Sequence, residues 1–118
     1  MAKGKVVNLW DVQSGLPPLH TNTDSWKLIT NSTAGAKDLE FWLTEMRPGA
    51  KTEMDTHPFE QVYFIISGRC KSFVGDDVFD LQPDTALFIP KGTPHRLDVI
   101  GTETLRFAVV NAPGRPEM

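Results

Sequence analysis

The sequence predicts an all-β fold, a sandwich or small barrel of about nine short strands. Nine glycines and nine prolines are spread along the 118 residues, which leaves intervals too short for several helices of ordinary length. The segments between these breakers are rich in β-branched and aromatic residues, and no helical period recurs in them. We therefore expect a single domain over residues 1–118 with a core of its own.

The expected strands follow one another closely along the chain. They are residues 5–10, 26–30, 39–46, 61–66, 70–74, 78–81, 86–89, 95–99 and 105–110. The residues Gly75, Asp76 and Asp77 form a hairpin-type loop between two of these strands. Residues 111–118 have no strand pattern, and we expect a flexible tail or an exchanged arm there.

Two of the expected strands are apolar on both faces, residues 61–66 and residues 105–110. Neither face of such a strand suits bulk water. We therefore expect a second sheet to cover one face and a second copy of the chain to cover the other, as in a homodimer.

Composition favours a small molecule as the binding partner. The chain has 12 Lys and Arg against 15 Asp and Glu, a net charge of −3, and no run of five basic residues, which argues against nucleic-acid binding. The longest apolar stretch, residues 62–66, is far shorter than the roughly 20 residues of a membrane helix. We expect no secretory leader. The single cysteine, Cys70, predicts a structural thiol and a reducing, cytoplasmic setting.

A group of polar residues lies between Gly49 and Gly68, namely Asp55, His57 and Gln61. In an extended strand, side chains at even spacings share one face, so these three side chains can point into one barrel. Glu60, an alternative carboxylate, falls on the opposite face by the same alternation.

A fourth donor, His95, comes just after the turn from Pro90 to Pro94 and can close the set from the opposite wall. Two imidazoles, one carboxylate and one amide oxygen suit a divalent ion such as Fe, Mn, Zn, Ni or Co. We predict a metal site formed by four residues: Asp55, His57, Gln61 and His95.

The two polar segments, residues 49–68 and 84–99, together resemble the signature motifs of the cupin family. In the first segment both glycines have the family's spacing. His57 matches its second histidine, whereas Asp55 replaces the first histidine and Gln61 the acidic residue. In the second, three residues match the family pattern and two depart from it: Pro90, Gly92 and His95 match, whereas Asp84 and Val99 depart. The resemblance implies a double-stranded β-helix, or jelly-roll barrel, and small cupins similar to this one carry glutamine at the acidic position and bind metal.

The roles of individual residues stay open at this point. Asp55 is a metal ligand, a general base beside the ion, or a turn residue that leaves the site weak. His95 alternatively hydrogen-bonds only a backbone carbonyl. His20 has no partner at ligand spacing, and we expect an exposed loop histidine. Four aromatic residues line a pocket or belong to the core: Trp42, Tyr63, Phe88 and Phe107.

Cupins include enzymes of many classes and also non-catalytic binding proteins, so the fold alone does not specify the reaction. We expect a metal-dependent enzyme that acts on a small polar organic molecule, of the dioxygenase, isomerase or lyase type. The alternative is a cupin that binds a sugar or an organic acid without turnover, with or without a metal. A titratable residue within hydrogen-bond reach of an open coordination position would favour the enzyme.

Overall fold

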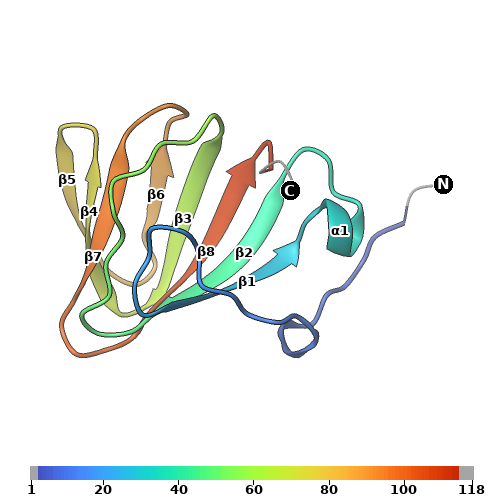
Figure 1. Cartoon of the computed structure of the whole chain (residues 1–118), viewed down its shortest axis with the longest axis horizontal. Helices are drawn as coiled ribbons and strands as arrows, with labels where there is room; N and C mark the ends of the chain where they lie inside the picture. The colour runs from blue at the N-terminus through green and yellow to red at the C-terminus, as the bar shows by residue number, and fades with distance from the viewer. Residues whose placement is uncertain (1–2, 115–118) are drawn as a thin grey trace.

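The computed structural model describes residues 3–114, which form two β-sheets and very little helix (Figure 1). The elements in chain order are η1 (Leu9–Asp11), β1 (Thr23–Ile29), α1 (Asn31–Ala34), β2 (Glu40–Met46), β3 (Glu60–Ser67), β4 (Arg69–Val74), β5 (Asp77–Leu81), β6 (Ala86–Ile89), β7 (His95–Ile100) and β8 (Leu105–Ala112). The larger sheet has the strand order β1-β2-β8-β3-β6, and the smaller sheet has the order β5-β4-β7. All paired strands are antiparallel. The predicted all-β jelly-roll class is confirmed.

The core lies between the two sheets and is built by side-chain alternation. In β8 every second side chain is buried, and the alternate ones are half-buried. The larger sheet contributes fully buried Met46, Ile65 and Leu105, and the smaller sheet contributes Leu97 and Cys70. This alternation explains why the apolar pattern of the sequence located most of the strands.

Cys70 is buried in this core, as expected for a structural thiol. Burial raises the pKa of the Cys70 thiol, and a contact between its Sγ and the Ser72 hydroxyl at 3.7 Å opposes the rise only in part. The thiol therefore stays protonated and unreactive in the folded protein.

The expected strand over residues 5–10 is wrong. Val6 is 99% exposed, and residues Leu9–Asp11 form a single 3₁₀ turn instead of a strand. The Asn8 side chain accepts a hydrogen bond from the backbone N–H of Trp10 at 2.9 Å, which caps this turn. Valine-rich composition does not make a strand where no neighbouring strand is available to pair with it.

The C-terminal boundary and one short helix also differ from expectation. Asn111 and Ala112, expected in a tail, continue β8, where Asn111 pairs with both β2 and β3 and Ala112 pairs with β3. Residues 115–118 of the expected tail or arm lie outside the described residues. The four-residue helix α1 begins after Thr30, whose hydroxyl accepts from the N–H of Thr33 in a capping box.

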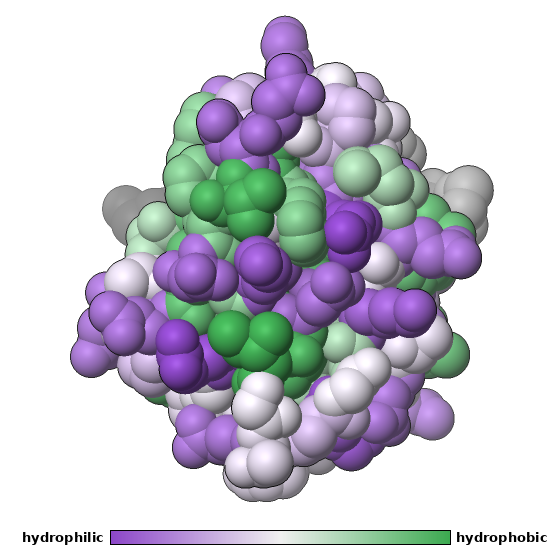
Figure 2. Space-filling model, turned by 90° about the vertical axis from the view of Figure 1, so that its left-hand side faces the viewer, coloured by the Kyte–Doolittle hydropathy of each residue, from purple (hydrophilic) through white to green (hydrophobic). Residues whose placement is uncertain are grey.

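The outer faces of the sheets carry apolar side chains in limited patches. Phe64 and Phe88 lie on the outer face of β3 and β6 and are 43% and 53% exposed. On the β4–β5 side of the molecule, Figure 2 shows hydrophobic patches separated by a band of hydrophilic residues. The expected homodimer stays a prediction. Within residues 3–114 no helix is long and apolar enough to cross a membrane.

Candidate functional site

A small cavity lies on the inner face of the larger sheet, where residues before β1 and between β2 and β3 close over it. Its volume is about 40 Å³, a few times the roughly 10–15 Å³ that a cavity needs to hold one water molecule. It has room for an ion with a water molecule and not for a large organic compound. The lining residues are Leu19, His20, Thr44, Thr52, Glu53, Asp55, His57, Gln61, Tyr63, His95, Phe107 and Val109.

All four residues of the predicted metal site line this cavity, but the backbone that brings them together is not the expected one. An extended strand from Asp55 to Gln61 is wrong, because β3 begins only at Glu60. Asp55 instead forms an isolated bridge with His95, with backbone nitrogen to carbonyl oxygen distances of 3.0 and 2.9 Å. The loop carrying Asp55 therefore lies directly against the start of β7.

A second backbone contact joins the two polar segments of the sequence. The N–H of Gly92 donates to the carbonyl of His57 at 2.7 Å. Gly92 has a φ of 73°, in the left-handed region that glycine adopts without strain. The turn before β7 thus holds the His57 loop in place, which gives the glycine of the second segment a structural role.

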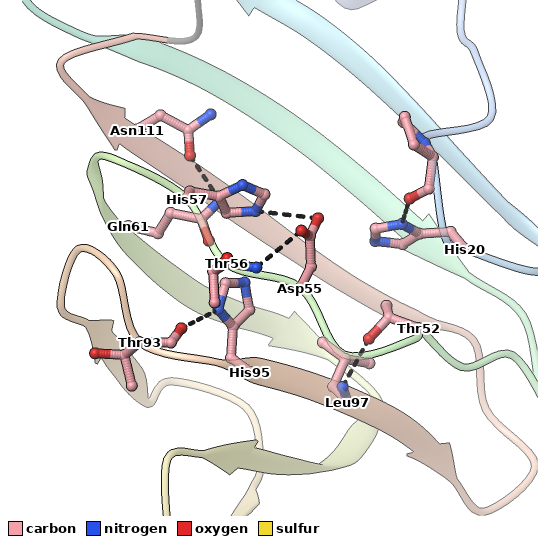
Figure 3. A network of polar contacts seen from close by, with 11 residues as sticks. His20, Thr52, Asp55, Thr56, His57, Gln61, Thr93, His95, Leu97 and Asn111 are labelled. Atoms are coloured by element: carbon pink, nitrogen blue, oxygen red, sulfur yellow. Dashed lines mark hydrogen bonds and ion pairs between the residues drawn. The ribbon is translucent and has the colours of Figure 1, made fainter.

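The two imidazoles face one another across the cavity (Figure 3). The ring centroids of His57 and His95 are 5.1 Å apart and the rings are tilted by 58°. His57 also stacks on Phe59, with a centroid distance of 4.8 Å and nearly parallel planes. Both rings are therefore held by packing and lie close together in the cavity wall.

His95 makes the hydrogen bond to a backbone carbonyl that was expected as its alternative role, but only one of its ring nitrogens takes part. Its Nδ1 lies 2.9 Å from the carbonyl oxygen of Thr93. Because a carbonyl only accepts, Nδ1 carries a proton, and in the neutral ring Nε2 then keeps its lone pair. A hydrogen bond of this kind fixes the tautomer of metal-binding histidines in general. The backbone contact is therefore compatible with a ligand role.

Asp55 makes the turn contact that was one of the three roles left open, and it uses one of its carboxylate oxygens for it. One carboxylate oxygen, Oδ1, accepts from the N–H of Thr56 at 2.8 Å, as in a turn. The other, Oδ2, lies 3.7 Å from Nε2 of His57 (Figure 3). The side chain is half-buried. The turn contact uses only one oxygen, so the second oxygen remains directed at the imidazole.

Gln61 supplies an acceptor oxygen that the protein itself does not use. The residue is 4% exposed, and its Nε2 donates to Oδ1 of Asn111 at 2.8 Å. Its Oε1 is buried without a hydrogen-bond partner among the described residues. An unmatched buried carbonyl oxygen costs about 1–3 kcal/mol. Such an atom in a cavity wall beside two imidazoles is typical of a position that a cation or a donor group fills.

Sequence reasoning missed two cavity residues and misplaced one aromatic. His20, expected in an exposed loop, is half-buried in the cavity wall with its Nδ1 2.7 Å from the Pro18 carbonyl oxygen. Glu53 also lines the cavity. No local signal marks either residue, because an isolated bridge between His20 and Thr52 brings distant segments together. Phe88 lies outside, on the opposite face of the sheet.

The described residues contain no group of three histidine, cysteine, aspartate or glutamate side chains arranged as a metal site. The amide oxygen of Gln61 is not among these residue types, so it is the additional donor that the cavity offers. Glu60 is exposed and points away from Gln61, as expected from alternation.

A second and much larger cavity, about 720 Å³, lies on the same inner sheet face beside the first. Residues 16–18 line the larger cavity, whereas Leu19 and His20 line the smaller one, so one short segment borders both. The polar lining of the larger cavity includes Lys27 and Glu40. The ammonium of Lys27 lies 4.9 Å from the centre of the Trp42 ring. This volume lies in the range of ordinary small-molecule pockets.

Comparison with known proteins identifies the family. The family model for the cupin domain matches residues 42–111, which span strands β2 to β8 and all four predicted site residues. The chain belongs to the cupin family. The resemblance in the two polar segments is therefore confirmed.

Among cupins, this chain is similar to proteins associated with polyketides. It is 30% identical over 108 residues to "Polyketide synthase CurC" of Streptomyces cyaneus, a match that covers 91% of this chain and 70% of the relative. It also superposes on the polyketide cyclase RemF from Streptomyces resistomycificus with a TM-score of 0.81 and 28% identity, covering 96% of this chain and 82% of that one.

A more distant structural neighbour shares the cupin fold alone. The oxalate decarboxylase of Bacillus subtilis, described with Mn(II) centres, superposes with a TM-score of 0.81 at 19% identity. The match covers 98% of this chain and 32% of that one.

Proposed function

We propose that this cupin binds a divalent metal ion in the small cavity and acts as a metal-dependent enzyme on a polycarbonyl compound of the polyketide class. The observation that carries the metal proposal is the buried, unpartnered Oε1 of Gln61 beside the imidazoles of His57 and His95. The donor set of two imidazoles, an amide oxygen and the nearby Asp55 carboxylate fits a borderline divalent cation. The substrate class is taken from the polyketide relatives.

The sizes of the two cavities support a model in which the smaller one binds the ion and the larger one binds most of the substrate. The small cavity, at about 40 Å³, accommodates the ion and a single reacting group. The larger one, at about 720 Å³, has the volume for the remainder of a folded polycarbonyl chain. Trp42 borders the larger cavity with an aromatic side chain, and the ammonium of Lys27 offers a hydrogen-bond donor to ketone groups there.

The residues around the small cavity have distinct tasks in this proposal. A bound divalent ion would supply a Lewis acid that polarises a substrate carbonyl. His57, His95 and Gln61 hold the ion, and the Thr93 carbonyl keeps His95 in the required tautomer. The Oδ2 of Asp55, 3.7 Å from Nε2 of His57, is either a fourth ligand or the base that accepts a proton from a carbon between two carbonyls. Tyr63 and Phe107 pack together with ring centroids 5.0 Å apart and form an apolar part of the cavity wall.

The enzymatic proposal is tested on the product pattern of a poly-β-ketone. The probe is generated in the assay from a malonyl thioester by a minimal polyketide synthase, and the products are separated by liquid chromatography with mass detection. With zinc-loaded protein we expect one cyclised isomer to accumulate at the expense of the spontaneous products. A product distribution that the protein leaves unchanged would contradict the enzymatic proposal and favour a non-catalytic binding cupin.

The contribution of Asp55 to metal binding is tested by Asp55→Asn. An asparagine oxygen still accepts from the N–H of Thr56, so the loop is preserved while the negative charge is removed. We expect the affinity for Zn(II) or Mn(II), measured by isothermal titration, to fall by about 10- to 100-fold. Asp55→His, which introduces the residue of the cupin motif, should bind at least as tightly as the parent.

A matched control removes a neighbouring charge from the same cavity wall. Glu53 also lines the cavity but is exposed, so solvent screens its carboxylate. We expect Glu53→Gln to reduce metal affinity by less than about 3-fold. Equal affinities for the parent and Asp55→Asn would remove Asp55 from the ligand set.

A further inference from the structure

Three buried polar residues form a row across the inner face of the larger sheet. Glu40 on β2 pairs directly with Asn111 on β8, and Asn111 pairs directly with Gln61 on β3. They are 5%, 0% and 4% exposed, respectively. Side chains of directly paired residues point to the same face. The row therefore connects the larger cavity, which Glu40 lines, to the small cavity, which Gln61 lines.

Hydrogen bonds along this row all run in one direction. Gln61 Nε2 donates to Asn111 Oδ1 at 2.8 Å, and Asn111 Nδ2 donates to Glu40 Oε1 at 3.4 Å. Oε1 of Glu40 accepts this bond, so Asn111 turns its NH₂ group toward β2. The Asn111 oxygen then faces β3 and requires the NH₂ group of Gln61. One carboxylate thus sets the orientation of two amides.

The fixed orientation of Asn111 determines which atom of Gln61 faces the small cavity. Figure 3 shows Gln61 in contact with Asn111 beside the histidines. With its nitrogen committed to Asn111, Gln61 leaves Oε1 as the atom without a partner. The reversed amide would leave an NH₂ group in that place, and this group repels a cation. The identity of one donor therefore depends on a residue two strands away.

We propose that Glu40 is a positioning residue for the cation site, acting through Asn111 on the amide of Gln61. This inference rests on the proposed function in one respect, since it takes a divalent cation as the ligand. The backbone of Gly114 lies close to the Glu40 side chain, since a Cβ added at Gly114 would come within 2.6 Å of the Glu40 Cγ. Glu40 acts on the cation site in this proposal only through the hydrogen bonds of the row.

The first test is the variant Glu40→Gln, which keeps the shape of the side chain and removes its acceptor-only character. The introduced amide can donate as well as accept, so it no longer fixes the orientation of Asn111. We expect the affinity for Zn(II), measured by isothermal titration into the apo-protein, to fall by about 10-fold, as for the loss of other groups that orient ligands. An unchanged affinity would overturn the proposal.

Testing Glu40→Gln in a chain that also carries Gln61→Glu shows whether Glu40 acts by orienting the Gln61 amide or by attracting the cation with its charge. In Gln61→Glu, residue 61 presents an acceptor oxygen whichever way it is turned, so its orientation no longer matters. Glu40→Gln should therefore change the Zn(II) affinity of the Gln61→Glu chain by less than about 2-fold. If Glu40 acted only through its charge, the loss of affinity would be of similar size in both backgrounds, and the positioning role would be wrong.

A measurement without metal keeps this test independent of the proposed function. In the NMR spectrum of the apo-protein, the side-chain NH₂ of Gln61 should be protected from exchange by its bond to Asn111. In Glu40→Gln, we expect lower protection and new cross-peaks from this NH₂ to the His95 ring. An amide that keeps its protection and its cross-peaks in a folded Glu40→Gln chain would overturn the proposal. Failure of every chain to bind Zn(II), with these amide changes present, would contradict the metal proposal alone.

Discussion

Replacing Gly68 by alanine should destabilise the protein by about 3 kcal/mol or more. Gly68 separates β3 from β4 and has a φ of 80°. A Cβ at this position would lie 2.6 Å from the carbonyl oxygen of Thr104 and 2.7 Å from the Cα of Leu105. Both are backbone atoms, and Leu105 begins the buried strand β8, so neither can move without disturbing the core. The strained φ adds about 1–2 kcal/mol to the cost of this contact.

Gly49 provides the matched control for Gly68. It is the other glycine of the first motif, with a φ of 81°, but apart from its chain neighbours no atom of residues 3–114 lies within 4 Å of a Cβ built there. Gly49→Ala should therefore cost only the conformational term, about 1–2 kcal/mol. Urea unfolding of both variants measures the difference. If both variants lost the same free energy of unfolding, steric crowding would not be the reason that glycine is required at position 68.

Removing His95 should abolish metal binding, with a loss of affinity greater than about 100-fold, because ligands contribute more than the groups that orient them. His95 is buried and keeps Nε2 directed away from the Thr93 carbonyl. In the parent, an ion at about 100 times its Kd should raise the free energy of unfolding by about 2.7 kcal/mol. His95→Ala and His57→Ala should show no such increase.

His20 is the control for this experiment, since it is the third histidine of the same cavity wall. Its Nδ1 faces the Pro18 carbonyl oxygen at 2.7 Å, and it is not part of the proposed ligand set. We expect His20→Ala to retain most of the metal-induced increase in the midpoint of thermal unfolding. If His20→Ala lost as much of this increase as His95→Ala, His20 would be a ligand in place of Asp55 or Gln61.

The strands were predictable because their side chains alternate around a shared core. Strands β2 to β8 each lie within two residues of their expected bounds at either end, and most of them have buried positions at a period of two. Residues 5–10 have a similar composition but pair with no strand in the described part of the chain, and Val6 is exposed. Composition alone carries no information about whether a neighbouring strand exists.

The site was predictable only in part, for reasons of distance along the chain. The motif spacing located His57, Gln61 and His95, because the glycines and prolines around them specify the turns that bring them together. It did not reveal Asn111, which was assigned to a tail, or His20, which reaches the cavity through a pairing with Thr52. Such contacts depend on the three-dimensional arrangement of strands and leave no local pattern.

The central claim is that the small cavity holds a divalent ion between His57 and His95, with Gln61 Oε1 as a further ligand. It is tested most directly by X-ray anomalous scattering from crystals grown with Zn(II), recorded on both sides of the zinc absorption edge. We expect one strong peak in the cavity, roughly 2.1 Å from a nitrogen of each imidazole and within coordinating distance of Gln61 Oε1. Crystals that contain zinc elsewhere, or show only water between the two imidazoles, would contradict the account.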